Sequence, residues 1–150
     1  MLWKEALWSV IPVHIFRTFD LRHALAEIET VAAPLSADHT ILICTKCRGA
    51  DEANRLRKAL APDLPAGYAL RGVNCMAGCD YPCAVGFQAD GKATYLFGDI
   101  TSVEDIAAIG EFAWQFLESR DGWTSAGDRP AALYDKTLAR LPALKRAATS

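Results

Sequence analysis

The stretch TILICTKCRGADEANRLRKAL, residues 40–60, decides the predicted fold. Its first four residues form an apolar, β-branched run, which is typical of a central strand covered on both faces. Residues 51–60 then show the apolar spacing of an amphipathic helix, and Pro62 ends that pattern. Because Cys44 and Cys47 lie between the two patterns, the stretch predicts a strand-helix unit with thiols at the end of the strand.

The residues that follow predict three further strands. Residues 68–73 are apolar enough for a second short strand. Residues 84–88 and 93–97 flank the dipeptide Asp90-Gly91, which supplies the positive φ angles that a tight hairpin turn needs. The predicted order up to this point is β-α-β-β-β.

A long helix is predicted after the hairpin. Residues 101–105 contain two overlapping capping boxes, and the apolar pattern continues to Gly122. Phe112, Trp114 and Phe116 occur within it, and we expect all three to pack in the core. The pattern as a whole predicts an α/β fold with one mixed sheet and helices packed on it.

A chain of 150 residues is long enough for one globular domain and too short for two of ordinary size. Residues 1–37 are interpreted as a helical N-terminal extension, residues 38–142 as the compact domain and residues 143–150 as a tail. Pro130 is expected to open a short C-terminal helix before that tail.

Composition excludes several classes of protein. The formal net charge is −2 at pH 7, which argues against a general nucleic-acid binder because phosphate contacts need an excess of Lys and Arg. Apolar stretches are too short to span a membrane, and charged residues directly follow the first of them, unlike a secretory signal. We therefore expect a cytoplasmic protein.

The five cysteines all lie between Cys44 and Cys83. An odd number in one cluster is unlike a disulfide framework, and the spacing Cys44-x2-Cys47 with Cys75-x3-Cys79-x3-Cys83 is that of metal ligands. A C-x2-C pair after a strand also fits a thioredoxin-type dithiol, but such an enzyme has no use for three more cysteines.

Four of these cysteines can converge at one edge of the sheet. Cys44 and Cys47 follow the first strand, and Cys75 and Cys79 follow the second, on a loop that Gly78 keeps from being helical. Four thiolates bind either tetrahedral zinc or an iron-sulfur cluster. The C-x3-C spacing departs from that of zinc ribbons, which favours the cluster.

The chain resembles a known group of proteins in its motifs. The cysteines around the first strand, CMAGC at 75–79, the hairpin and the helix after it resemble the thioredoxin-like [2Fe-2S] ferredoxins. The motifs ICTKCRG, CMAGCDYPCAV, YLFGDI, DGW and RP are similar to a bacterial family of small, uncharacterised, predicted metal-binding proteins, over residues 39–142. The resemblance implies a thioredoxin-like β-α-β-β-β-α fold, with the metal ligands Cys44, Cys47, Cys75 and Cys79.

The fifth cysteine has two interpretations. Cys83 can be a small buried residue at the start of the third strand, or it can substitute for one of the other four ligands. Burial is the interpretation we favour, because free cysteines are usually buried. Lys46, Arg48 and Arg71 are either surface charges or groups that offset the charge of a tetrathiolate cluster.

Together these observations predict an electron carrier that binds one [2Fe-2S] cluster and passes electrons to a redox partner protein. No acid-base set or substrate motif is visible, so we do not expect an enzyme. The alternatives are a structural or regulatory zinc protein and a metal-delivery protein. Neither nucleic acid nor membrane is expected as a partner, and homodimerisation is left open.

Overall fold

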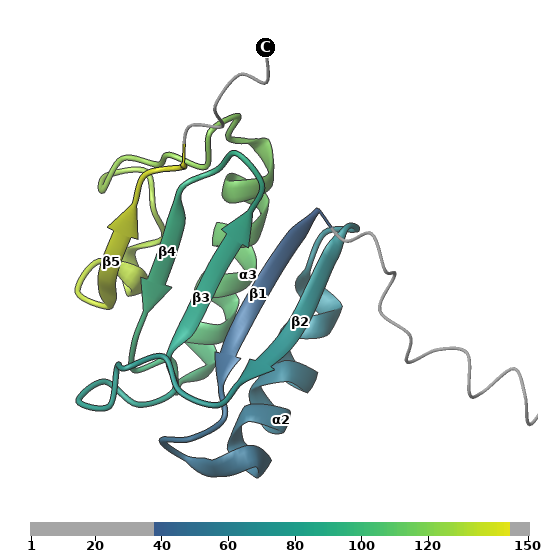
Figure 1. Cartoon of the computed structure of the whole chain (residues 1–150), viewed down its shortest axis with the longest axis vertical. Coiled ribbons are helices and arrows are strands. Elements are labelled where there is room, and N and C mark those ends of the chain that lie inside the picture. Colours follow the sequence, from purple (N-terminus) through teal and green to yellow (C-terminus); the bar gives the residue numbers. More distant parts are fainter. Residues whose placement is uncertain (1–37, 145–150) are drawn as a thin grey trace, which may run out of the picture. The chain divides into compact units, whose positions relative to one another are not determined.

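A computed structural model of the chain describes residues 38–144 and shows one five-stranded mixed sheet with two α-helices (Figure 1). The strand order is β2-β1-β3-β4-β5, with β1 parallel to β2 and the other neighbours antiparallel. This architecture confirms the predicted α/β class and the order β-α-β-β-β-α. The elements are β1 (His39–Cys44), α2 (Gly49–Leu60), η2 (Ala61–Asp63), β2 (Tyr68–Val73), β3 (Val85–Ala89), β4 (Thr94–Phe97), α3 (Val103–Glu118), η3 (Ala131–Leu133) and β5 (Thr137–Leu141).

Both α-helices cover the same face of the sheet, behind it in Figure 1. On β1, Ile41 and Ile43 are buried beneath the helices, whereas Leu42 points to the other face and is partly exposed. The expectation that this strand is covered on both faces is therefore wrong for the part of the chain described. The sequence could not show that the Leu42 face is open, because apolar residues occupy both faces of β1.

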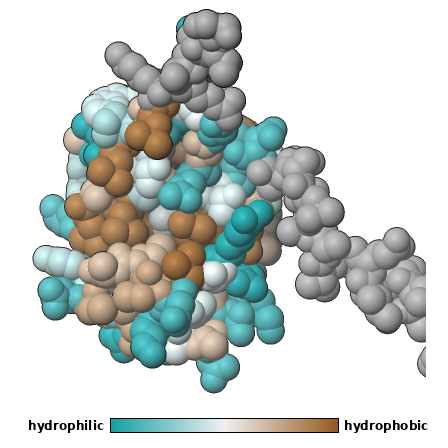
Figure 2. Space-filling model, in the orientation of Figure 1, coloured by the Kyte–Doolittle hydropathy of each residue, from teal (hydrophilic) through white to brown (hydrophobic). Residues whose placement is uncertain are grey.

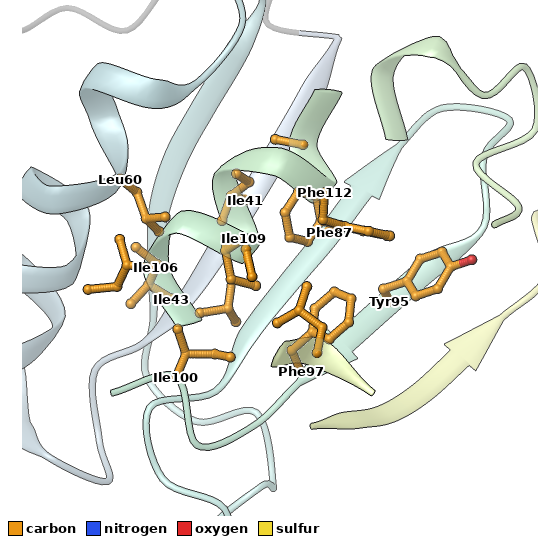
Figure 3. Packing of buried hydrophobic residues seen from close by; sticks show 14 of the residues in the cluster. Ile41, Ile43, Leu60, Phe87, Tyr95, Phe97, Ile100, Ile106, Ile109 and Phe112 are labelled. Atoms are coloured by element: carbon orange, nitrogen blue, oxygen red, sulfur yellow. The ribbon is translucent and has the colours of Figure 1, made fainter. Parts of the chain in front are cut away.

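The core between helices and sheet is built around aromatic rings (Figure 3). The ring of Phe112 lies edge-on, with centroids 5.0 Å apart, to those of Phe87, Tyr95 and Phe97. These contacts join α3 to β3 and β4. The buried hydroxyl of Tyr95 accepts a hydrogen bond of 3.0 Å from the backbone N–H of Thr124, which satisfies its polar group.

Both ends of α3 are fixed by specific contacts. The Ser102 hydroxyl accepts from the backbone N–H of Asp105, and the Asp105 carboxylate accepts from that of Ser102, which confirms a predicted capping box. At the other end, Lys92 donates to the carbonyl oxygens of Phe116 and Leu117 at 2.6 and 2.8 Å.

One residue on α3 lies differently from the prediction. Phe112 and Phe116 are buried as expected, but Trp114 is half exposed, so its expected place in the core is wrong. Its indole N–H donates at 3.3 Å to the carbonyl of Asp63, the last residue of η2. Helical spacing alone did not separate these positions, because the pattern around them is apolar on more than one face.

The C-terminal part of the domain also differs from the prediction. Pro130 precedes the single 3-10 turn η3 rather than an α-helix, and β5 follows it. In β5, Ala139 pairs with Leu96 of β4, so this strand completes the sheet at an edge that would otherwise be unpaired. The predicted N-terminal helices of residues 1–37 lie outside the described residues. Within residues 38–144, no helix is long and apolar enough to cross a membrane.

Candidate metal centre

The cysteines gather at the edge of the sheet where β1 and β2 end and β3 begins (Figure 1). Because β1 and β2 are parallel, their carboxyl ends meet there. Thr45 joins the two ends: its backbone N–H and its hydroxyl both donate to the carbonyl of Val73, at 2.8 and 3.1 Å. The backbone N–H of Cys44 donates to the carbonyl of Ala84 at 3.0 Å, which brings the start of β3 to the same place.

Cys44 and Cys47 form a close pair at this edge. Their sulfur atoms are 3.7 Å apart, with Cys44 buried and Cys47 partly exposed. Two sulfurs bound to one tetrahedral metal at about 2.3 Å lie about 3.8 Å apart. The spacing of the pair therefore fits two ligands of a single metal ion.

The two thiols of this pair differ in acidity. Burial by itself would raise the pKa of Cys44, but the backbone N–H groups of Lys46, Cys47 and Met76 donate to its sulfur and hold its pKa below the ordinary value. For Cys47, the hydrogen bond to Cys44, burial and interaction with Cys79 raise the pKa to about 11. The backbone around Cys44 thus stabilises a thiolate, the form of cysteine that binds metal.

The other two predicted ligands lie on the loop between β2 and β3. Cys75 and Cys79 are both exposed. Cys79 interacts with Cys47, whereas the sulfur of Cys75 accepts a hydrogen bond of 3.4 Å from the backbone N–H of Ala77 in its own loop. The structure thus brings Cys44 and Cys47 into direct contact, with Cys79 close enough to Cys47 to affect its pKa.

The four thiols are not arranged as a closed coordination sphere. Within residues 38–144, no group of three or more Cys, His, Asp or Glu side chains has the geometry to hold a metal ion. The donor set itself fits zinc or iron, since soft thiolates are the ligands that these metals share. We find a preformed pair, Cys44 and Cys47, beside two exposed loop thiols, Cys75 and Cys79.

Cys83 is buried, with 5% of its surface exposed, which confirms its predicted burial. Burial and the nearby Glu52 carboxylate raise the pKa of its thiol. It lines a hollow of about 480 Å³ together with Arg48, Glu52 and Thr101, at the beginning of α2. A neutral, buried thiol is the expected state of a packing residue rather than of a metal ligand.

The loops of this edge contain unusual backbone conformations. Among the described residues, the three non-glycine residues with positive φ are Ala77, Cys83 and Asp99, at 57°, 61° and 53°. All three lie in the loops around the thiols. Such conformations cost roughly 1 kcal/mol or more each for residues with a side chain, and they concentrate at functional sites.

A network that the sequence did not reveal supports the cysteine loop. Lys136 donates to the Asp105 carboxylate at 2.6 Å and to the carbonyl of Asp99 at 2.7 Å. The backbone N–H of Asp99 in turn donates to the carbonyl of Pro82 at 2.9 Å. Lys136 and Asp105 are 31 positions apart, so no local spacing could have pointed to the pair.

Gly98 explains one of the motifs singled out from the sequence, YLFGDI. A Cβ atom at this position would lie 2.5 Å from the Cβ of Tyr81 and 2.8 Å from Leu138. Only glycine lets the cysteine loop pack this closely against the end of β4. The motif therefore preserves the contact between the loop and the sheet.

The predicted cationic residues are placed differently from one another. The backbone N–H of Lys46 contacts the sulfur of Cys44, whereas the charge of Arg48 acts on Cys83. Arg71 is exposed on β2, paired in register with Leu42 of β1. Their predicted effect on the charge of a bound cluster stays a prediction.

Comparison with known proteins places the chain in a family. The chain matches no curated protein and no solved structure. Residues 41–143, more than half of the chain, match the family model described as "Protein of unknown function (DUF1636)". That match includes all five cysteines and every strand except the first two residues of β1. The chain belongs to the DUF1636 family.

Proposed function

We propose that this protein is a single-electron carrier that binds one [2Fe-2S] cluster through Cys44, Cys47, Cys75 and Cys79. The observation that carries the proposal is the sulfur pair of Cys44 and Cys47, 3.7 Å apart at the end of β1 and beside a loop with two more thiols. In a [2Fe-2S] cluster each iron takes two cysteines, and the four thiols divide into two such pairs.

The protein supplies two different environments for the two pairs. Cys44 is buried and receives N–H groups from Lys46, Cys47 and Met76. Hydrogen bonds to the sulfur atoms stabilise the reduced cluster and raise its reduction potential. Cys75 and Cys79 are exposed, so the iron that they bind would be the one nearest to a partner protein.

Binding of the cluster requires the loop of residues 74–79 to close towards β1. The sulfur of Cys75 must exchange its hydrogen bond with Ala77 for a bond to iron. The positive φ of Ala77 sits between the two loop cysteines, where a change of backbone conformation moves Cys75 relative to Cys79. When bound, the cluster supplies the one-electron chemistry, and the thiolates fix its position at the sheet edge.

The proposal is tested by anaerobic reconstitution of the full chain with iron and sulfide. We expect a brown protein with visible absorption, an EPR signal after one-electron reduction, and about two irons and two sulfides per chain. Colourless protein that carries one zinc and takes up no iron or sulfide would contradict it.

A zinc protein is the second candidate, because the same sulfur spacing is compatible with it. A separation of 3.7 Å fits two ligands of tetrahedral zinc equally well. If zinc is structural, a chelator should lower the melting temperature markedly, because structural zinc binding contributes folding free energy. If the exposed thiols Cys75 and Cys79 serve metal delivery instead, a competing chelator should remove the metal within minutes rather than hours.

A further inference from the structure

The face of the sheet opposite the helices carries hydrophobic surface (Figure 2), in which the structure has an apolar hollow beside a mainly polar one. A hollow of about 220 Å³ lies over β1, β3, β4 and β5, and a second of about 460 Å³ lies between β5 and the cysteine loop. Leu96 and Ala139 line both hollows, so the two lie side by side. We call them together the open-face groove, whose large apolar residues are Leu42, Met76, Tyr81, Leu96, Leu138 and Leu141.

The part of this groove over the strands is an exposed apolar surface, and the part next to the cysteine loop is more polar. Tyr81 and Leu141 are 48% and 58% exposed. Figure 2 looks onto this face, and hydrophobic surface gathers there on the side of β4 and β5. Exposed apolar surface is where a partner protein can bury side chains of its own.

The open-face groove ends at the candidate metal centre. Met76, which lines it, is the residue directly after Cys75. Asp80 and Tyr81, which also line it, follow Cys79 directly. A protein seated in the groove would therefore lie against the same loop that carries the two exposed thiols.

The charged residues that line the groove are both acidic, whereas Arg71 of β2 pairs in register with Leu42 on its other side. The charged lining residues are Asp80 and Asp135, both exposed and both at the end nearest the cysteines, and the remaining lining residues are uncharged. An apolar contact with charges of one sign beside it fits a weak, electrostatically guided encounter, in which the charges set the rate of association. The complementary surface has an apolar centre with basic residues at the end that meets the cysteine loop.

We propose that the open-face groove is the docking surface for a redox partner protein, which inserts an apolar side chain between β1 and β5 and places Lys or Arg next to Asp80 and Asp135. This inference rests on the proposed electron-carrier function, and it adds the site and the chemistry of the partner. The groove brings that partner to the exposed side of the metal centre.

The test measures electron transfer from the reduced, reconstituted full chain to mitochondrial cytochrome c, a basic single-electron acceptor, at low ionic strength. The double variant Asp80→Lys/Asp135→Lys should lower the second-order rate constant about tenfold, and the difference should disappear at high salt. The control Glu111→Lys/Glu118→Lys changes the net charge equally on exposed positions of α3, and should lower the rate less than twofold. Leu141→Gln should also lower it more than Val103→Gln, an exposed aliphatic control on α3.

The outcomes separate the two proposals. Visible spectra of every variant are recorded first, and absence of a cluster in the wild type overturns the proposed function. If the cluster is present and both double variants slow transfer equally, the docking surface is overturned while the electron carrier stands. Self-association that Leu141→Gln abolishes, with transfer rates unaffected by Asp80→Lys/Asp135→Lys, assigns the groove to a second copy of the chain and also overturns the docking proposal.

Discussion

The helix-covered face of the sheet and its thiol edge differ in burial and in backbone conformation. Between the sheet and α3, aromatic side chains such as Phe87, Phe97 and Phe112 are fully buried. At the edge, Cys75 and Cys79 are exposed, and the loops around them contain every described non-glycine residue with positive φ. The buried core of the first region therefore stabilises the fold, whereas the second region has strained backbone and exposed thiols.

The largest expected effect is a loss of stability from a substitution in the aromatic core. Phe112→Ala removes a ring that contacts three other aromatic rings, and should lower the free energy of unfolding by about 3 to 5 kcal/mol. Chemical denaturation measures the loss. Trp114→Ala on the same helix is the control and should cost less than about 1 kcal/mol, because that side chain is half exposed. Equal losses for the two variants would contradict the description of the core.

A second variant tests the network that links core and edge. Asp105→Asn weakens the contact with Lys136 and should lower the free energy of unfolding by about 1 to 3 kcal/mol at pH 7. Burial by itself would raise the pKa of Asp105, but Lys136 and the N–H groups of Ser102 and Thr101 hold that pKa below its ordinary value.

The sign of the pH effect follows from that lowered pKa. A carboxyl with a lower pKa in the folded state contributes stability above its unfolded pKa near 4, and this contribution is lost as the pH falls through the folded value. Stability measured between pH 7 and pH 3 should therefore fall more steeply for the wild type than for Asp105→Asn. Parallel pH curves would show that Asp105 contributes nothing to the pH dependence of stability.

Substitution of Cys83 tests whether this residue packs in the core or binds the metal. Cys83→Ser places a hydroxyl in a buried position and should lower the free energy of unfolding by about 1 to 3 kcal/mol. The visible spectrum after reconstitution should be unchanged. Cys83→Ala is the matched control, which keeps a small apolar side chain and should recover most of the stability.

The smallest expected effect concerns strain in the cysteine loop. Ala77→Gly should raise the free energy of unfolding by up to about 1 kcal/mol, because glycine adopts the φ of 57° without penalty. Ala107→Gly, an exposed position inside α3, should instead lower it by about 1 kcal/mol. Destabilisation of both variants to the same degree would show that the loop at Ala77 is not strained.

The sequence was sufficient for the order of elements up to α3, since each has a local signal: an apolar run, a helical period, an Asp-Gly turn or a capping box. β5 was missed because Thr137–Leu141 is a short edge strand whose structure depends on pairing with β4. The open face of the sheet was missed for a related reason. Leu42 is as apolar as Ile41 and Ile43, so the pattern of β1 could not show that one face lacks a cover among the described residues.

At the candidate site, spacing located the thiols but not their environment. The parallel pairing of β1 and β2 makes the ends of both strands meet, which the predicted strand-helix-strand order already implied. The N–H groups at Cys44 depend on loop conformation, and the contact between Lys136 and Asp105 depends on the missed strand. Such contacts join residues that are distant in sequence, and only the fold brings them together.

The most direct test of the central claim is the iron content of five single Cys→Ser variants after anaerobic reconstitution, with circular dichroism to confirm folding. We expect serine at Cys44, Cys47, Cys75 or Cys79 to abolish or strongly reduce bound iron and visible absorption, because each loss opens a coordination position on iron. Cys83→Ser should retain about two irons per chain. Loss of iron at Cys83, together with retention at Cys47 or Cys79, would contradict the assignment of the four ligands.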